Sequence, residues 1–160
     1  MKTEQTVLKG FVRAALVDVR GPRKGRVRMG PWCQNAITAD GLEKYACGAI
    51  GAIAGSKQIG SMQVASQTAA PTTSQTSASG EFSGTDGVRK ATTNTFIANG
   101  TMQATASWAT NEANQSAVGA VALYNTSSGG TAASIATFTA SQKTTDQTLA
   151  VTYQWRLTTA

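Results

Sequence analysis

The sequence predicts a mainly β protein, an antiparallel β-sandwich with one short α-helix near residues 38–54. Three observations support this fold class. From residue 88 to the end, polar and apolar side chains alternate, as is typical of strands with one buried face. Turn-forming pairs such as Asn99-Gly100 separate the alternating stretches. No repeat of 20–50 residues is present, which argues against a solenoid. A jelly roll is one arrangement that the expected strand number allows.

The first 34 residues are expected to form a basic strand-and-hairpin segment, residues 1–34, ahead of a sandwich domain, residues 35–160. Residues 7–19 alternate like a strand, and Gly21-Pro22 then interrupts it as turn residues do. Residues 26–29 would form a short return strand. The sequence therefore predicts a hairpin with a basic tip.

A single segment has a convincing helical period. Thr38 is a good N-cap residue, and apolar side chains follow it at spacings of three and four. These side chains are Leu42, Tyr45, Ala46, Ala49, Ile50 and Ile53. Gly48 and Gly51 each weaken a helix by about 1 kcal/mol relative to Ala, so the helix is expected to break there or to pack very closely against a neighbour.

The rest of the chain predicts strands separated by loops. Residues 67–80 are rich in Ser, Thr and Ala and would form a long loop or an arm, because their apolar area is too small to fold unaided. The predicted strands are 59–65, 92–98, 101–110, 117–124, 132–141 and 147–158. In the last of these, odd-numbered positions such as Trp155 are apolar. Trp108, Tyr153 and Trp155 are expected in the core.

The net charge of +6 is concentrated at the start of the chain. Residues 1–28 hold eight basic and two acidic side chains, whereas residues 29–160 hold six of each. Five cations fall within nine residues, namely Arg20, Arg23, Lys24, Arg26 and Arg28. Such a tip could contact an acidic protein face, neutralise nucleic-acid phosphates or simply be solvated. We favour the protein contact. Trp32 is the only aromatic residue close to the tip, whereas a platform for base stacking needs several aromatic side chains.

The composition argues against an enzyme, and we predict no catalytic, cofactor-binding or metal-binding residue. The chain has no His, which is the commonest general base and metal ligand. Cys33 and Cys47 are too few for a disulfide framework or a four-thiolate zinc site, and Cys47 is expected to be a small buried side chain. We also expect no cofactor.

Two pairs of carboxylates were candidates for acid–base chemistry. Asp40 and Glu43 fall in the first turn of the predicted helix, where the helix dipole favours negative charge. Glu81 and Asp86 flank a Gly-rich turn. Glycoside hydrolysis needs two carboxyl groups facing each other across a cleft, and neither spacing indicates that geometry. A structural role is therefore the preferred interpretation of both pairs.

The chain is expected to be made in a cytoplasm and to have no membrane partner. The apolar run at residues 46–54 is well short of the roughly 20 residues of a membrane span, and the first residues do not resemble a secretory signal. Many core side chains would be Ala, each burying little area. Association with identical or neighbouring subunits would add stability, so we expect a homo-oligomer, with a trimer as the simplest choice.

Several short motifs occur in a characteristic order. Asn35-Ala-Ile-Thr-Ala-Asp-Gly41 opens the predicted helix, and Ile59-Gly60 follows. Gly119-Ala-Val-Ala-Leu-Tyr-Asn125 and Leu149-Ala-Val-Thr-Tyr-Gln-Trp155-Arg-Leu157 lie further along. This order resembles small structural proteins of tailed bacteriophages, over roughly residues 30–160.

The resemblance implies a virion component without catalytic activity, assembled in the host cytoplasm. We expect a capsid decoration (cement) protein whose partner is the major capsid protein or another virion protein. A tail component, such as an adaptor or a fibre-associated protein, is the alternative that the resemblance leaves open. A carbohydrate-binding module and a non-specific DNA-binding protein are further alternatives from other classes.

Overall fold

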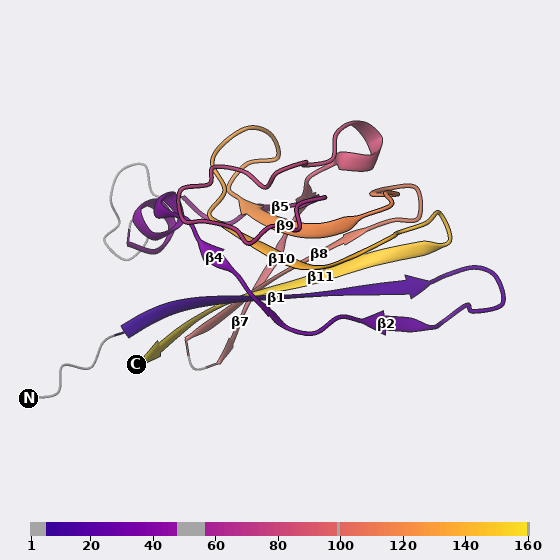
Figure 1. Ribbon diagram of the computed structural model, residues 1–160. Coiled ribbons are helices and arrows are strands. Elements are labelled where there is room, and N and C mark those ends of the chain that lie inside the picture. Colours follow the sequence, from indigo (N-terminus) through magenta and orange to yellow (C-terminus); the bar gives the residue numbers. More distant parts are fainter. Residues whose placement is uncertain (1–5, 48–56, 99, 160) are drawn as a thin grey trace, which may run out of the picture.

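The chain folds into two antiparallel sheets packed face to face, which confirms the predicted β-sandwich (Figure 1). The structure, a computed structural model, describes residues 6–47, 57–98 and 100–159. Sheet A contains β1 (Thr6–Asp18), β2 (Val27–Met29), β3 (Cys33–Gln34), β7 (Thr93–Ala98), β8 (Thr101–Trp108) and β11 (Gln147–Thr159). Sheet B contains β4 (Ala36–Ile37), β5 (Ser61–Ala65), β6 (Lys90–Ala91), β9 (Val118–Tyr124) and β10 (Ser134–Ser141). Two helical turns, η1 (Gly41–Cys47) and η2 (Gly84–Gly87), accompany the strands.

The longest pairing in the fold joins the two ends of the described chain. β1 lies antiparallel to β11 from Thr6 opposite Thr159 to Asp18 opposite Gln147. The strand order in sheet A is β2-β1-β11-β8-β7, and that in sheet B is β4-β10-β9-β5-β6. Strands from the predicted N-terminal segment therefore lie in the same sheet as strands from the predicted sandwich domain.

The core is built from the inner faces of both sheets. Trp108 and Tyr153 are fully buried and Trp155 is 7% exposed, as the alternation predicts. Each indole nitrogen has a partner, because Trp108 Nε1 donates to Val88 O at 3.1 Å and Trp155 Nε1 donates to Ser134 Oγ at 3.0 Å. Around these rings the core contains many alanines, so neighbouring strands contribute small side chains between a few large ones.

The predicted helix is present in part and differs in type. Gly41 N donates to Thr38 Oγ1 at 3.0 Å, so Thr38 caps the helix as expected. Residues 41–47 then form a π-helix and not an α-helix. In this wider turn Tyr45 is 4% exposed and lies edge-on to Trp155, with ring centroids 6.4 Å apart. Residues 48–54 of the predicted helix lie outside the described residues.

The loop at residues 67–80 is fixed to the sandwich by hydrogen bonds. Gln67 is buried and donates to Ala69 O at 2.9 Å, while its Oε1 accepts from Ser79 N at 2.7 Å. Ala132 N in turn donates to Thr76 O at 2.8 Å. Polar contacts thus hold a segment that has little apolar area to bury.

Candidate interaction surface

The most distinctive surface feature is the β1–β2 hairpin with its five cations. Its strands pair from Ala15 opposite Met29 to Val17 opposite Val27, which confirms the predicted return strand. Gly25 N donates to Asp18 O at 2.7 Å across the turn, and Gly25 has the positive φ of 86° that this turn requires. The hairpin ends at the opposite end of β1 from Thr6 (Figure 1).

The structure leaves all five predicted contact residues exposed. Among the described residues, none of the five has an ion pair or a side-chain hydrogen bond. They are Arg20, Arg23, Lys24, Arg26 and Arg28. Their charge is therefore available to a partner.

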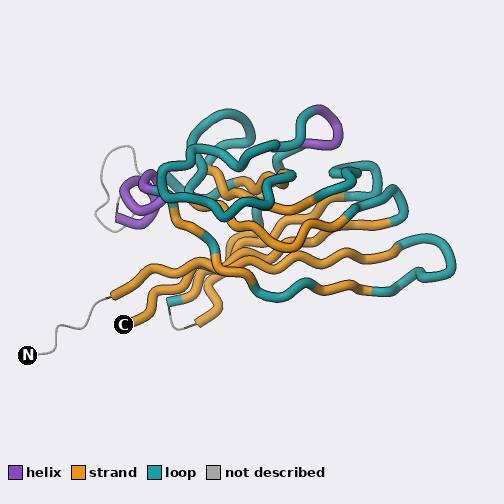
Figure 2. The backbone as a smooth tube through the Cα atoms, viewed as in Figure 1, coloured by secondary structure: helices purple, strands orange, loops and turns teal. Residues whose placement is uncertain are grey.

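The outer face of sheet A continues this surface toward the other end of β1. We use the name basic face for the side chains of Lys9, Phe11, Arg13, Gln154 and Arg156, with Trp32 beside them. Lys9 lies directly opposite Arg156 in the strand register. The helices and long loops of the described chain lie on the sheet B side and leave this face open (Figure 2).

Aromatic rings and guanidinium groups are paired on the basic face. The Arg13 guanidinium lies 4.8 Å from the centroid of the Trp32 ring, and that of Arg156 lies 5.7 Å from the centroid of Phe11. These distances fit cation–π contacts. A shallow hollow lies between Phe11, Trp32, Gln154 and Arg156.

Aliphatic side chains lie between the hairpin tip and the basic face. Val27 and Met29 on β2 are 52% and 56% exposed, and Trp32 is 41% exposed. The strands of sheet A contain a single acidic residue, Asp18, which is buried and accepts from Gln147 Nε2 at 2.7 Å. The surface thus combines positive charge with exposed apolar groups.

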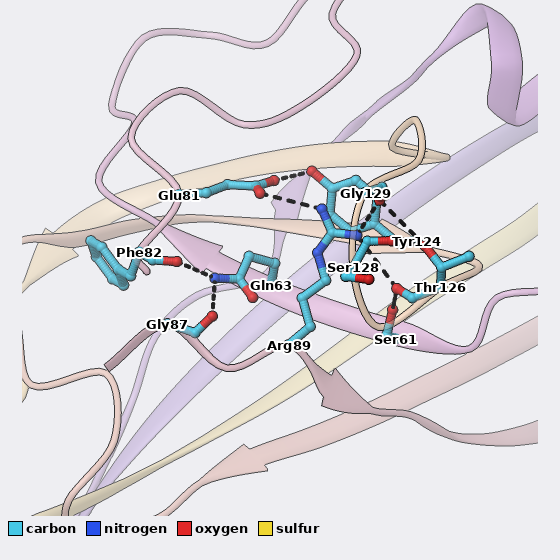
Figure 3. Close-up of polar contacts among 10 residues, drawn as sticks. All are labelled: Ser61, Gln63, Glu81, Phe82, Gly87, Arg89, Tyr124, Thr126, Ser128 and Gly129. Carbon is cyan, nitrogen blue, oxygen red and sulfur yellow. Dashed lines mark hydrogen bonds and ion pairs between the residues drawn. The ribbon is translucent and has the colours of Figure 1, made fainter. Parts of the chain in front are cut away.

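A second polar cluster lies on the sheet B side, and its charged groups contact one another within the chain (Figure 3). Arg89 stacks on the ring of Tyr124, with its Cζ 3.4 Å from the ring centroid, and its Nη2 lies 3.4 Å from Glu81 Oε2. Arg89 Nη1 also donates to the carbonyl oxygens of Thr126 and Gly129. The Tyr124 hydroxyl donates to Glu81. We call these contacts the Arg89 clamp.

The Arg89 clamp accounts for one of the carboxylate candidates. Burial raises the pKa of Glu81 above its ordinary value, and the neighbouring Arg89 opposes that rise. Glu81 faces Arg89 and Tyr124, and the side chain of Asp86 lies outside the description. No signal in the sequence indicated Arg89, because its partners are 8 to 40 residues away along the chain.

The other candidate residues have ordinary structural contacts. Lys57 Nζ lies 2.8 Å from Asp40 Oδ2, while the side chains of Glu43 and Cys47 lie outside the description. The half-buried Cys33 packs against the core, and its thiol lies 3.8 Å from Pro31 O. The described residues hold no cluster of three His, Cys, Asp or Glu side chains that could bind a metal.

Two apolar cavities open at the ends of the sandwich. One of about 200 Å³ lies beside β2 and is lined by residues including Leu16, Met29 and Phe138. The other, of about 400 Å³, is lined by residues including Leu8, Met102 and Trp155. Within the described part of the chain, no helix is long and apolar enough to cross a membrane.

Comparison with known proteins identified no relative of this chain. No protein-family model matches the chain, and neither the curated proteins nor the solved structures gave a match.

Proposed function

We propose that this chain is a non-enzymatic structural protein of a tailed-phage virion, which decorates the head and stabilises it by bridging shell subunits. The observation that supports the proposal most directly is the hairpin tip, where five exposed cations have no partner within the described chain. Retaining such a cluster raises self-repulsion, and an acidic docking surface would relieve it. The likeness of the motifs to phage structural proteins supports the same assignment.

The repetition and symmetry of a viral shell also support a decoration role. A shell presents many identical sites, so modest contacts at each site become effective together when one molecule touches more than one subunit. A cyclic trimer would place three hairpin tips around an axis, which matches the threefold positions of a shell. The major capsid protein is the expected partner.

Quantitative binding to intact heads tests the proposal. Purified chain would be titrated onto expanded, DNA-free heads of the phage that encodes it, and bound copies would be counted by gel densitometry. We expect saturation at a fixed number of copies per shell subunit and a higher temperature of head disruption. Absence of binding to heads, with binding to purified tails, would instead assign the chain to the tail.

A five-residue variant identifies the hairpin's role in that experiment. We expect replacement of Arg20, Arg23, Lys24, Arg26 and Arg28 by Ser to weaken head binding at least 10-fold while leaving the unfolding temperature almost unchanged, because these side chains are exposed. Head binding at wild-type strength would contradict the proposed role of the tip. The nucleic-acid alternative would be favoured by a different result. In that case the wild-type chain would not bind heads but would be retained on duplex DNA, and the five-residue variant would lose this retention.

A further inference from the structure

We propose that the basic face is a second docking site, in which an acidic protein segment with apolar side chains lies across Phe11, Trp32 and Arg156. The inference rests on the proposed function, since it identifies a further part of the same contact surface and the chemistry of the partner. The hairpin tip supplies charge alone, whereas the basic face supplies charge, shape and apolar area.

The strand register provides the first argument. Lys9 and Arg156 are exposed and directly opposite each other on neighbouring strands. Like charges at directly opposed positions destabilise a sheet. No acidic side chain in the strands of sheet A offsets this pair, because Asp18 is buried against Gln147. A carboxylate brought by a partner would lie between the two cations and relieve their repulsion.

The aromatic residues provide the second argument, which favours protein over nucleic acid. Arg13 is placed over the ring of Trp32 and Arg156 over that of Phe11. Bases stack on open aromatic faces, and these rings already carry guanidinium groups. Exposed Val27 and Met29 lie further along β1, opposite Val17 and Ala15, and they would gain from apolar contact with a protein but little from a phosphate backbone. Arg, Trp, Phe and Met are also the residue types enriched at protein interfaces.

Charge also excludes a second copy of this chain as the occupant. A twofold contact between two basic faces would bring Lys9, Arg13 and Arg156 of each copy against the same cations of the other. Such an arrangement costs free energy, and the partner must therefore be a different, acidic surface. Any homo-oligomer would use another part of the molecule.

Trp32 provides a direct probe of the site. It is 41% exposed, whereas Trp108 and Trp155 are 0% and 7% exposed, so acrylamide quenches mainly the fluorescence of Trp32. The full chain would be titrated with a 12-residue peptide of alternating Glu and Val, a Glu/Ser peptide of equal length and a 20-base-pair DNA duplex. We expect the Glu/Val peptide to bind at least 10-fold more tightly than the Glu/Ser peptide and to protect Trp32 from acrylamide. Protection by DNA at equal concentration, or no protection by either peptide, would overturn the inference.

Charge-matched variants assign the binding to the basic face. We expect Lys9→Ser with Arg156→Ser to weaken Glu/Val peptide binding about 10-fold. Ser127→Asp with Ser128→Asp changes the net charge equally in the exposed loop after β9 and should weaken it less than 3-fold. Equal weakening by both pairs would mean that net charge alone governs binding, which would refute the site.

The same variants separate this inference from the proposed function. Head binding that is unaffected by Lys9→Ser with Arg156→Ser, but lost in the hairpin variant, would leave the decoration proposal standing and refute the docking role of the basic face. Peptide binding with the expected variant effects, without any head binding, would refute the decoration proposal and retain the site.

Discussion

At the scale of single residues, the motif that opens the helix joins the two sheets. Asn35 N donates to Gly10 O at 3.0 Å, and Asn35 Nδ2 donates to the buried Tyr153 Oη at 2.5 Å, so both contacts hold sheet A. Three residues later, Thr38 Oγ1 donates to the carbonyl oxygen of Ala132 at 2.5 Å, beside sheet B. Asn35 and Thr38 therefore hold the chain where it passes from sheet A to sheet B.

Gly41 is the residue of this motif with the least freedom to change. A Cβ at Gly41 would lie 1.9 Å from Ala133 O, which is backbone and cannot swing away. We expect Gly41→Ala to lower the free energy of unfolding by about 1–3 kcal/mol, the usual cost of overpacking. Urea unfolding followed by circular dichroism measures this change. Gly84→Ala is the control: φ is +69° and no atom lies within 4 Å of the added Cβ, so it should cost only the roughly 1–2 kcal/mol of a left-handed backbone.

The Asn35–Tyr153 hydrogen bond allows a second test at this scale. Removal of the hydroxyl in Tyr153→Phe would leave the buried Asn35 Nδ2 without its acceptor, at a cost of about 1–3 kcal/mol. Because the Tyr153 hydroxyl also contacts Ser134, we expect Tyr153→Phe to cost less in the Asn35→Ala background than in the parent protein, but not to become neutral, in a double-mutant cycle. Additive losses would show that the two side chains are not coupled. Urea midpoints of the four proteins provide the measurement.

At the scale of elements, the Arg89 clamp fastens the loop after β9 to the start of β6. Arg89 precedes β6, while Thr126 and Gly129 lie in the loop. A lysine in its place would keep the charge but could not form the planar, stacked contact with Tyr124. We expect Arg89→Lys to increase amide hydrogen exchange in residues 125–130 and to leave exchange in β1 and β11 unchanged. Unchanged exchange in the loop would show that the clamp does not hold it.

Two carboxylates in these elements predict opposite pH dependences. Burial raises the folded pKa of Glu81, so its contribution to stability is fully present below its unfolded pKa and is lost as pH rises through the folded value. The hydrogen bond from Lys90 lowers the folded pKa of Glu112, so its contribution is present above its unfolded pKa and is lost as pH falls through the folded value.

Matched amide variants measure both effects. From pH 4 to pH 7, we expect Glu81→Gln to become more stable relative to the parent protein, and Glu112→Gln to become less stable relative to it. Urea unfolding at four pH values gives the two trends. Trends of the same sign for both variants would contradict the assigned environments.

The elements also show which parts of the structure the sequence could predict. The alternation of polar and apolar residues correctly predicts that Trp108, Tyr153 and Trp155 are buried. Gly21-Pro22 correctly predicts the turn of the β1–β2 hairpin. Both signals are local in the sequence. The π-helix was predicted as an α-helix, since both types accept the same spacing of apolar side chains. The Arg89 clamp and the basic face depend on strand pairing between distant residues, which local patterns do not contain. The five cations of the tip were found because they are adjacent in sequence.

At the scale of the whole molecule, the exposed positive charge gathers on one sheet. The hairpin tip and the basic face are both parts of sheet A, whereas Arg89 and Lys90 on the sheet B side are paired with Glu81 and Glu112. Among the described residues, the exposed cations therefore gather on the strands and the turn of sheet A, which is the surface that we propose for an acidic partner.

This asymmetry predicts strong salt dependence of binding to an acidic surface. We expect the chain's affinity for immobilised poly-glutamate to fall at least 10-fold between 50 and 200 mM NaCl, because exposed charges are screened over about 10 Å at 0.1 M. The hairpin variant should show a much shallower dependence. Surface plasmon resonance at several salt concentrations supplies the data. An equal salt dependence of affinity in the wild-type chain and the hairpin variant would show that the hairpin tip does not make the contact with poly-glutamate.

The pairing of β1 with β11 has a consequence for the order in which the protein acquires its shape. The β7–β8 and β9–β10 hairpins connect neighbouring strands along the chain and can form early. The pairing of Thr6 with Thr159 needs β11 and therefore forms late. Proteins dominated by such distant pairings fold in milliseconds to seconds. During synthesis, β1 is made well before β11, and the edge of β1 that pairs with β11 stays open until β11 leaves the ribosome, so this edge is where unfinished chains would aggregate.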